Sequence, residues 1–250
     1  YILSIFASRT AAEMQRVRSK EILKEQARNL ADANNMKDKL LSVISHDLLH
    51  PIHSIMGFTD LIHSNSDNYD KSKMLERIDM IDESIKKIYF RLQNLSDWSK
   101  MTRNEFRVCP EEILAGAFFR NCLSMFKVLI ELKELNVSMN VSDSLILITD
   151  KQMLTGIIMN LLFNAIENTP SGGSIALEIY EHNGGIKLVV RDNGKGMDAD
   201  EIKRISRYKD NLTELDIDIN KPGLGLALVY AFVNLLDGSV DIVSDHNKGT

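Results

Sequence analysis

The first hundred residues show the apolar spacing of two long helices. Residues 9 to about 66 are predicted to form one long helix. Within it, eight positions from Leu23 to Leu48 recur in steps of four and three, which is the heptad seam of a coiled coil. A polar turn cluster at 64–68 ends this helix, and a second helix is predicted from about 70 to 102. Polar residues within a seam lower stability and fix the register. The seam consists of Leu23, Ala27, Leu30, Asn34, Lys37, Leu41, Ile44 and Leu48.

Each predicted helix carries one apolar stripe, and two long helices around a short turn form an antiparallel hairpin. A single hairpin would leave part of these stripes exposed to water, whereas two hairpins bury them as a four-helix bundle. The pattern therefore predicts a homodimer. The alternative is an amphipathic helix that packs within one chain.

The pattern changes near residue 103, where short alternating runs replace the long stripes. These runs predict strands at 137–141, 145–148, 174–179, 186–190 and 239–244. Helical stretches lie between them, near 111–133, 150–167 and 224–236. We therefore expect an all-α helical hairpin followed by a separate α+β domain.

Composition narrows the function classes. The net charge of −5 leaves no electrostatic footprint for nucleic acid. Cys109 and Cys122 form no C-x-x-C pair, so the cysteines indicate neither a zinc knuckle nor a redox motif. We interpret both cysteines as reduced thiols, which are typical of proteins in a reducing compartment.

Both ends of the sequence look cut. The chain begins with the six residues YILSIF, which are too few for the roughly 20 that cross a bilayer. We interpret them as the end of a membrane helix that lies upstream of Tyr1. A short apolar helix start is the alternative. At the other end, Lys248-Gly249-Thr250 stops without a capping element.

A histidine stands out on the first helix. At about 100° per residue, His46 lies roughly 200° from the seam residue Ile44 and should face solvent. An exposed imidazole beside the Asp47 carboxylate is a plausible nucleophile, because the acid can hold one ring nitrogen protonated. Pro51 removes a helical hydrogen bond from the Asp47 carbonyl, so we expect a bend just past the histidine.

Metal binding is a competing interpretation of the same segment. His46, His50 and His53 follow at i, i+4 and i+7, and two histidines at i, i+4 are common in zinc helices. Pro51 distorts that spacing, and the sequence offers no further ligand cluster nearby.

Three further motifs carry candidate chemistry. Asn160 and Asn164 share one helical face, and amide oxygens suit a hydrated magnesium ion. The string DNGKGM at 192–197 follows a predicted strand, where a carboxylate can accept a hydrogen bond from an exocyclic amine and glycines permit close approach of a flat base. The string GLGL at 223–226 precedes a helix, and backbone N–H groups at a helix start bind phosphate. Each motif alone is weak.

In their order and spacing, these motifs resemble those of the sensor histidine kinases. The string SHDLLHP at 45–51 resembles the H box, and 160–170 resembles the N box. Residues 192–197 resemble the G1 box, 223–226 the G2 box, and 248–250 the start of a G3-type turn. The resemblance implies a signalling helix over 1–35, a dimerisation and phosphotransfer domain over 36–103, and a Bergerat-type ATP-binding domain over 104–250, truncated at its C-terminal end.

The resemblance also implies residue roles. His46 is the phospho-acceptor and Asp47 its acidic helper, Asn164 is a magnesium ligand, and Asp192 reads the adenine amino group. The expected partners are ATP, Mg2+, a second copy of the chain and the receiver domain of a response regulator. The segment 198–222 corresponds to an ATP lid. The resemblance further implies that this chain is the cytoplasmic portion of a bacterial inner-membrane protein. The remaining expected nucleotide-site residues are Asn160, Gly194, Gly196, Lys221, Gly223 and Gly225.

The sequence departs from the family pattern at four positions. Leu49 stands where Arg is usual, and His50 stands at the position linked to phosphatase action, where Thr, Ser or Asn is usual. Glu167 replaces a basic residue of the N box, so ATP phosphates would be repelled unless magnesium or Lys221 compensates. Lys221 itself replaces a glycine. Two alternatives follow, namely a degraded kinase that acts as a nucleotide-binding scaffold and another ATPase of the same superfamily.

Overall fold

The structure, a computed structural model, describes residues 14–27, 49, 51–64, 70–103, 105–182, 184–206 and 224–250. The chain divides into two compact units, residues 1–49 and 50–250. In the first unit, residues 14–27 form a helix whose side chains are all exposed. Several predicted site residues lie outside the described residues, namely His46, Asp47, His50, Lys221 and Gly223.

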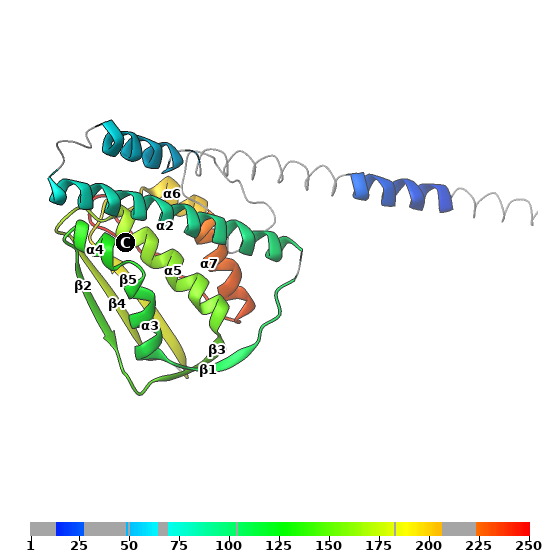
Figure 1. Cartoon of the computed structure of the whole chain (residues 1–250). Coiled ribbons are helices and arrows are strands. Elements are labelled where there is room, and N and C mark those ends of the chain that lie inside the picture. The colour runs from blue at the N-terminus through cyan, green and yellow to red at the C-terminus, as the bar shows by residue number, and fades with distance from the viewer. Residues whose placement is uncertain are drawn as a thin grey trace, which may run out of the picture. The chain divides into compact units, whose positions relative to one another are not determined.

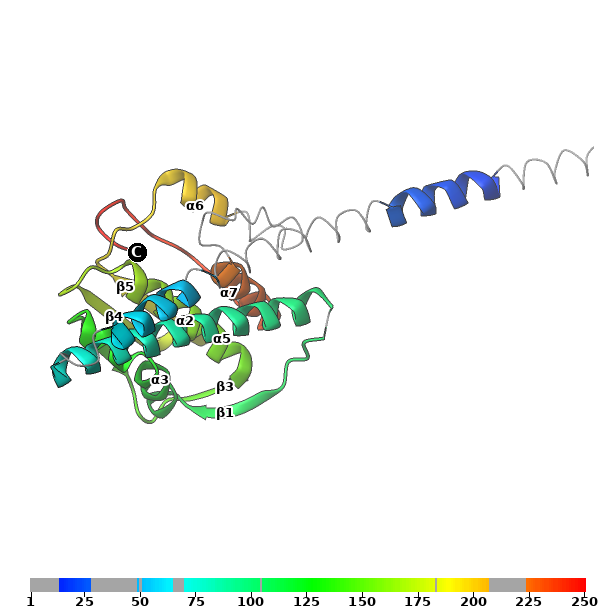
Figure 2. The same cartoon turned by 45° about the horizontal axis from the view of Figure 1, so that its top comes forward.

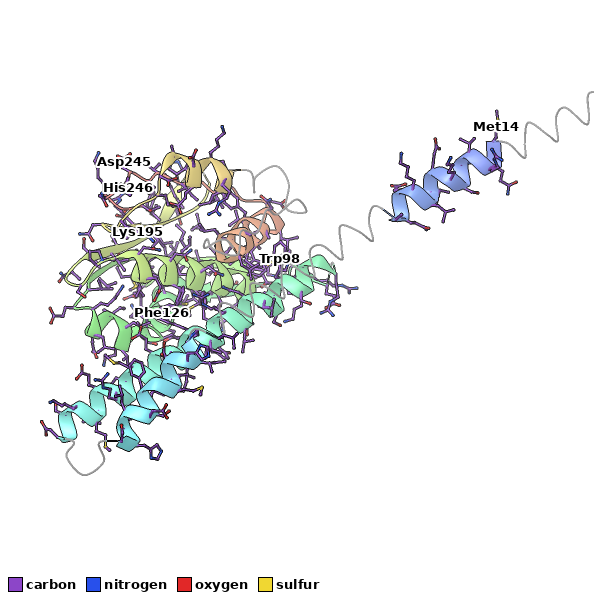
Figure 3. All side chains as sticks on the ribbon, turned by 90° about the horizontal axis from the view of Figure 1, so that it is seen from above. Met14, Trp98, Phe126, Lys195, Asp245 and His246 are labelled. Atoms are coloured by element: carbon purple, nitrogen blue, oxygen red, sulfur yellow. The ribbon has the colours of Figure 1, made fainter. Side chains whose placement is uncertain are left out.

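The second unit opens with the predicted helical hairpin. Residues 51–64 are helical, and α2 (Lys71–Thr102) runs antiparallel beside them (Figures 1 and 3). The Arg77 guanidinium lies over the Phe58 ring, with 5.8 Å from its Cζ to the ring centroid. Apolar side chains remain exposed along both helices, as expected of stripes that one chain does not cover. These are Ile52, Met56, Leu61, Met74, Leu75, Ile78, Ile85, Tyr89 and Leu92.

An α+β domain follows the hairpin, as predicted. The strands β2 (Asn136–Val141), β4 (Ser174–His182) and β5 (Gly185–Asp192) form a mixed sheet in the order β2-β4-β5. β4 is parallel to β2 and antiparallel to β5. A second, two-stranded sheet pairs β1 (Pro110–Leu114) with β3 (Ile146–Asp150).

Helices cover one face of the mixed sheet (Figure 1). They are α3 (Ala115–Ser124), α4 (Lys127–Leu132) and α5 (Lys151–Asn168). The helix α7 (Leu224–Leu235) packs against α5 and α2, and α6 (Ala199–Ser206) lies in the predicted lid segment. Alternate residues of β4 point toward the helices and are buried, and α5 lies at the centre of the core. The largest fully buried side chains of the described residues are Phe119, Phe232, Met153, Ile158, Leu162 and Ile166.

Two of the secondary-structure predictions are wrong. Residues 110–114 are strand β1 and not the start of a helix, because Ile113 is buried opposite Leu147 in the pairing with β3. Proline followed by two glutamates is a good local helix start, and the tertiary pairing overrides it. Residues 239–244 alternate as a strand would, but among the described residues they pair with no strand, and Val243 is 87% exposed.

Lys133 caps the end of α5 from a distant part of the chain. Its Nζ donates to the carbonyls of Ile166 at 2.6 Å, Glu167 at 3.1 Å and Thr169 at 2.9 Å. A cation at the negative end of a helix dipole satisfies carbonyls that have no intrahelical partner.

Replacing Lys133 with methionine should lower the free energy of unfolding by about 2 kcal/mol, because charge-assisted hydrogen bonds to partly buried carbonyls are lost. Urea denaturation measures this change. The matched control is Lys127→Met on the neighbouring helix, whose ion pair with Glu131 is exposed and 3.7 Å long. A control as destabilised as Lys133→Met would show that the capping contacts contribute nothing specific.

Candidate functional site

The long buried helix α5 carries the two predicted asparagines. It begins at Asp150, whose Oδ1 accepts a hydrogen bond from the backbone N–H of Met153 at 2.9 Å, as an N-cap does. One turn from its end, the Asn168 side chain donates to the Asn164 carbonyl at 2.7 Å. Asn164 is half-buried, whereas Asn160 is 1% exposed. The structure therefore leaves Asn164 accessible and encloses Asn160.

Asp192 ends strand β5 and begins a tight turn. Its Oδ1 accepts a hydrogen bond from the Gly194 backbone N–H at 2.8 Å, which is the geometry of an Asx turn. Burial raises the pKa of the Asp192 carboxyl above its usual value, although hydrogen bonds from the backbone of Gly194 and Thr250 oppose the shift. A half-buried carboxylate held by a backbone N–H is a fixed acceptor that points in one direction.

The Asp192 turn is joined to the end of α5. The Lys195 N–H donates to the Asn168 carbonyl at 3.2 Å. An added Cβ on Gly194 would overlap the same carbonyl oxygen, so only glycine permits this close approach. The two motifs that the sequence placed 28 residues apart, Asn164 and Asp192, thus lie on directly bonded segments.

The segment 244–250 supports the other side of this turn. The Ser244 hydroxyl accepts from the Met197 N–H at 2.8 Å and donates to the Gly249 carbonyl at 2.9 Å. The backbone N–H of Asn247 donates to the Lys195 carbonyl at 2.6 Å. Figure 3 shows Lys195, Asp245 and His246 gathered at this edge of the domain. The predicted terminal turn therefore holds the Asp192 loop in place.

Gly225, in the first turn of α7, lies against Asn160. An added Cβ on Gly225 would come within 2.5 Å of Asn160 Oδ1, so any larger residue here would displace the Asn160 amide. α5 and α7 contact each other along their lengths. Among the predicted site residues, the structure brings Asn160 and Gly225 into contact. It places Asp192 and Gly194 against Asn168 at the end of α5, one turn beyond Asn164.

The helix α2 supplies residues that the sequence analysis missed. Lys87 Nζ lies 3.0 Å from Glu167 Oε1 and 2.7 Å from Glu83 Oε1. Burial by itself would lower the pKa of Lys87, but the hydrogen bonds and charges of Glu83 and Glu167 raise it above its usual value. Glu167 is therefore neutralised by Lys87 in this structure, whereas the sequence suggested magnesium or Lys221.

Two negative findings concern only the described part of the chain. There, no group of three or more His, Cys, Asp or Glu residues is placed to hold a metal ion. Two of the three histidines in the alternative zinc motif, His46 and His50, lie outside that part. In the same residues, no helix combines the length and the apolar character that a membrane span requires.

Comparison with known proteins gives two family matches. Residues 36–104 match the His Kinase A (phospho-acceptor) domain, and residues 149–250 match the histidine kinase-, DNA gyrase B- and HSP90-like ATPase. The first of these spans contains His46. The second contains Asn160, Asn164, Asp192 and Gly225.

Curated relatives include histidine protein kinase DivJ of Caulobacter vibrioides, which is 27% identical over 93% of this chain and 39% of its own length. Sensor histidine kinase RcsC of Escherichia coli is 25% identical over 94% of this chain and 25% of its own length. The chain thus spans less than half of these relatives. Among solved structures, ShkA matches 85% of this chain and 44% of its own, with a TM-score of 0.55 and 18% identity, which shows a common fold.

Proposed function

We propose that this chain, which belongs to the sensor histidine kinase family, phosphorylates its own His46 from ATP and passes the phosphoryl group to an aspartate of a response regulator. Residues 36–103 form the dimerisation and phosphotransfer domain and 104–250 the ATP-binding domain, while 1–35 connect to a membrane segment upstream of Tyr1. The observation that carries the proposal is the Asp192 carboxylate, fixed by Gly194 and joined to the α5 segment that carries Asn164.

Nucleotide recognition follows from these two residues. The Asp192 carboxylate accepts a hydrogen bond from the adenine amino group, and Gly194 lets the base approach the backbone. The amide oxygen of Asn164 is the neutral oxygen donor that magnesium accepts, and the bound ion supplies charge neutralisation at the phosphates. The solved ShkA complex contains AMPPNP, an ATP analogue, which supports ATP as the nucleotide here.

The chemical step is a phosphoryl transfer with a loose transition state, so positioning and charge neutralisation dominate. A ring nitrogen of His46 attacks the γ-phosphorus, the bond from that phosphorus to the bridging oxygen breaks, and ADP leaves. Asp47 holds the proton on the other ring nitrogen and so stabilises the developing positive charge. The phosphohistidine then donates its phosphoryl group to the receiver carboxylate. A second chain provides the partner hairpin, and the exposed apolar side chains of α2 support this part of the proposal.

Incubation with γ-labelled ATP and magnesium tests the proposal. Wild-type protein should incorporate label that is lost in acid and retained in base, as a phosphohistidine is, whereas His46→Gln should incorporate at least about 100-fold less. The matched control is His63→Gln, an exposed histidine on the same helical hairpin, which should label normally. Equal labelling of wild type and His46→Gln would show that another residue is the acceptor.

Nucleotide binding by the wild type without any labelling would support the scaffold alternative. The match of residues 36–104 to a phospho-acceptor domain argues against a clamp-type ATPase, which has no use for a phospho-acceptor histidine.

A further inference from the structure

The helices α2 and α5 meet along a seam of three matched pairs. Lys87 pairs with Glu167, the Phe90 and Phe163 rings stack with centroids 4.6 Å apart, and Asn94 pairs with Asn160. Along α2 the steps are three and four residues, and along α5 they are four and three in the opposite direction. The contacts therefore fall on one face of each helix in an antiparallel register. Figures 1 and 2 both show α2 running over α5.

The Asn94–Asn160 pair occupies the Asn160 amide. Asn94 Nδ2 donates to Asn160 Oδ1 at 2.8 Å, and Asn160 Nδ2 donates back to Asn94 Oδ1 at 3.2 Å. The second proton of Asn160 Nδ2 goes to the Gly156 carbonyl at 2.8 Å. An amide nitrogen has two protons, so the donor side of Asn160 is saturated. With Gly225 against its oxygen and 1% of the residue exposed, Asn160 has no surface left for a ligand.

The contacts between α2 and α5 have a defined register, but their net free energy of docking is only marginally favourable. Beyond the seam, α2 also buries Asp97 and Trp98, which are 5% and 3% exposed. Among the described residues the Trp98 indole N–H has no hydrogen-bond acceptor, and burial raises the pKa of the Asp97 carboxyl. A buried unpaired donor and a desolvated carboxyl both oppose docking. The Lys87–Glu167 pair is partly exposed, and ion pairs of that kind contribute little.

We propose that α2 docks reversibly on α5 through Lys87, Phe90 and Asn94, a set of contacts that we call the clasp. In this proposal Asn94 and a magnesium-bound nucleoside triphosphate compete for Asn160. The proposal rests on the proposed function and adds a regulatory step to it. With the clasp closed, Asn160 is satisfied by Asn94. With the clasp open, the Asn160 amide is free for the phosphates or for the water shell of their metal ion. A change in the helical hairpin that lifts α2 therefore raises the fraction of chain that is competent to bind.

A charge-swap cycle on the full chain tests the clasp, with AMPPNP and magnesium as the probe and calorimetry as the measurement. Lys87→Glu places two carboxylates opposite each other, opens the clasp and should tighten AMPPNP binding about threefold. In a Glu167→Lys background, the same substitution rebuilds an ion pair and should weaken binding. If Lys87 only attracts the phosphates, Lys87→Glu weakens binding in both backgrounds, and the clasp is wrong.

The neighbouring Lys86→Glu is the matched control. Lys86 pairs with Asp82 on the exposed side of α2, so this variant makes the same charge change without touching the seam. We expect its affinity for AMPPNP to equal that of the wild type. A tightening as large as that of Lys87→Glu would assign the effect to net charge and overturn the clasp.

Trp98 provides an independent readout because it is the only tryptophan of the chain and is buried where α2 contacts α7 (Figure 3). Saturating AMPPNP should lift α2, expose the indole and shift its emission to longer wavelength. AMPPNP binding seen by calorimetry with no shift would overturn the clasp alone. An absence of binding in every variant would overturn the proposed function, and the clasp with it.

Discussion

Asp192→Asn is expected to fold at least as stably as the wild type and to bind ATP about 30- to 100-fold more weakly. The amide oxygen can still accept from the Gly194 N–H and preserve the Asx turn. Its NH2 group, however, meets the adenine amino group as donor against donor. Loss of a charge-assisted hydrogen bond to a buried partner corresponds to about 2–3 kcal/mol. Calorimetric titration with AMPPNP measures the affinity.

The difference in free energy of unfolding between Asp192→Asn and the wild type should depend on pH. Burial raises the pKa of Asp192 in the folded state, so folding favours the protonated carboxyl. The stabilisation by Asp192 is therefore present at low pH and is lost as the pH rises through the folded-state pKa. Asp192→Asn removes this loss, so its stability advantage should be largest near neutral pH and shrink on acidification. The control is Asp245→Asn on the neighbouring turn, an exposed carboxylate paired with Lys248. Weakened ATP binding in Asp245→Asn as well would mean that net charge, and not adenine recognition, is responsible.

Gly196→Ala is expected to lower the free energy of unfolding by about 3 kcal/mol or more and to disrupt nucleotide binding. Gly196 has a φ of +63°, which strains any residue with a Cβ, and the added methyl would overlap the Asp245 carbonyl oxygen. The overlap would push segment 244–250 off the Asp192 loop. Urea denaturation and AMPPNP titration measure both consequences.

Gly172→Ala separates strain from overlap. Gly172 has a φ of +75°, but nothing lies within 4 Å of an added Cβ there. In this variant the free energy of unfolding should fall only by the cost of a Cβ in the left-handed region, about 1 kcal/mol. Nucleotide binding should be normal. If Gly172→Ala and Gly196→Ala were destabilised equally, contact between segment 244–250 and the Asp192 loop would not matter for stability.

Elements with strong local periodicity were predictable from the sequence. The predicted helices at 70–102, 150–167 and 224–236 correspond to α2, α5 and α7, and strands β2 to β5 were predicted within a few residues of their ends. The motif around Asp192 was recognisable because a strand must end in a turn, and glycines are needed where the backbone of that turn comes close to other groups. Both wrong predictions, at 110–114 and 239–244, concern segments whose local pattern fits two conformations.

The face of α2 that packs against α5 and α7 was not predictable, although its residues recur at helical spacing. Lys87, Phe90, Asn94 and Trp98 recur at helical spacing, but the stronger apolar stripe at 78–95 masks them. Polar residues such as Lys87 and Asn94 at such spacing are usually solvated. Only the position of α5 makes Asn94 a buried partner and Glu167 a neutralised carboxylate.

By itself, the sequence determined the order of helices and strands, the chemical character of the site residues and the need for glycine at tight turns, since these depend on periodicity and on backbone sterics. Only the tertiary structure decided which residues meet. Hydrogen bonding and burial between segments distant in the chain join Asp192 to the end of α5, enclose Asn160 behind Asn94 and place Lys87 on Glu167. These contacts depend on helix orientation and register, which no local pattern encodes.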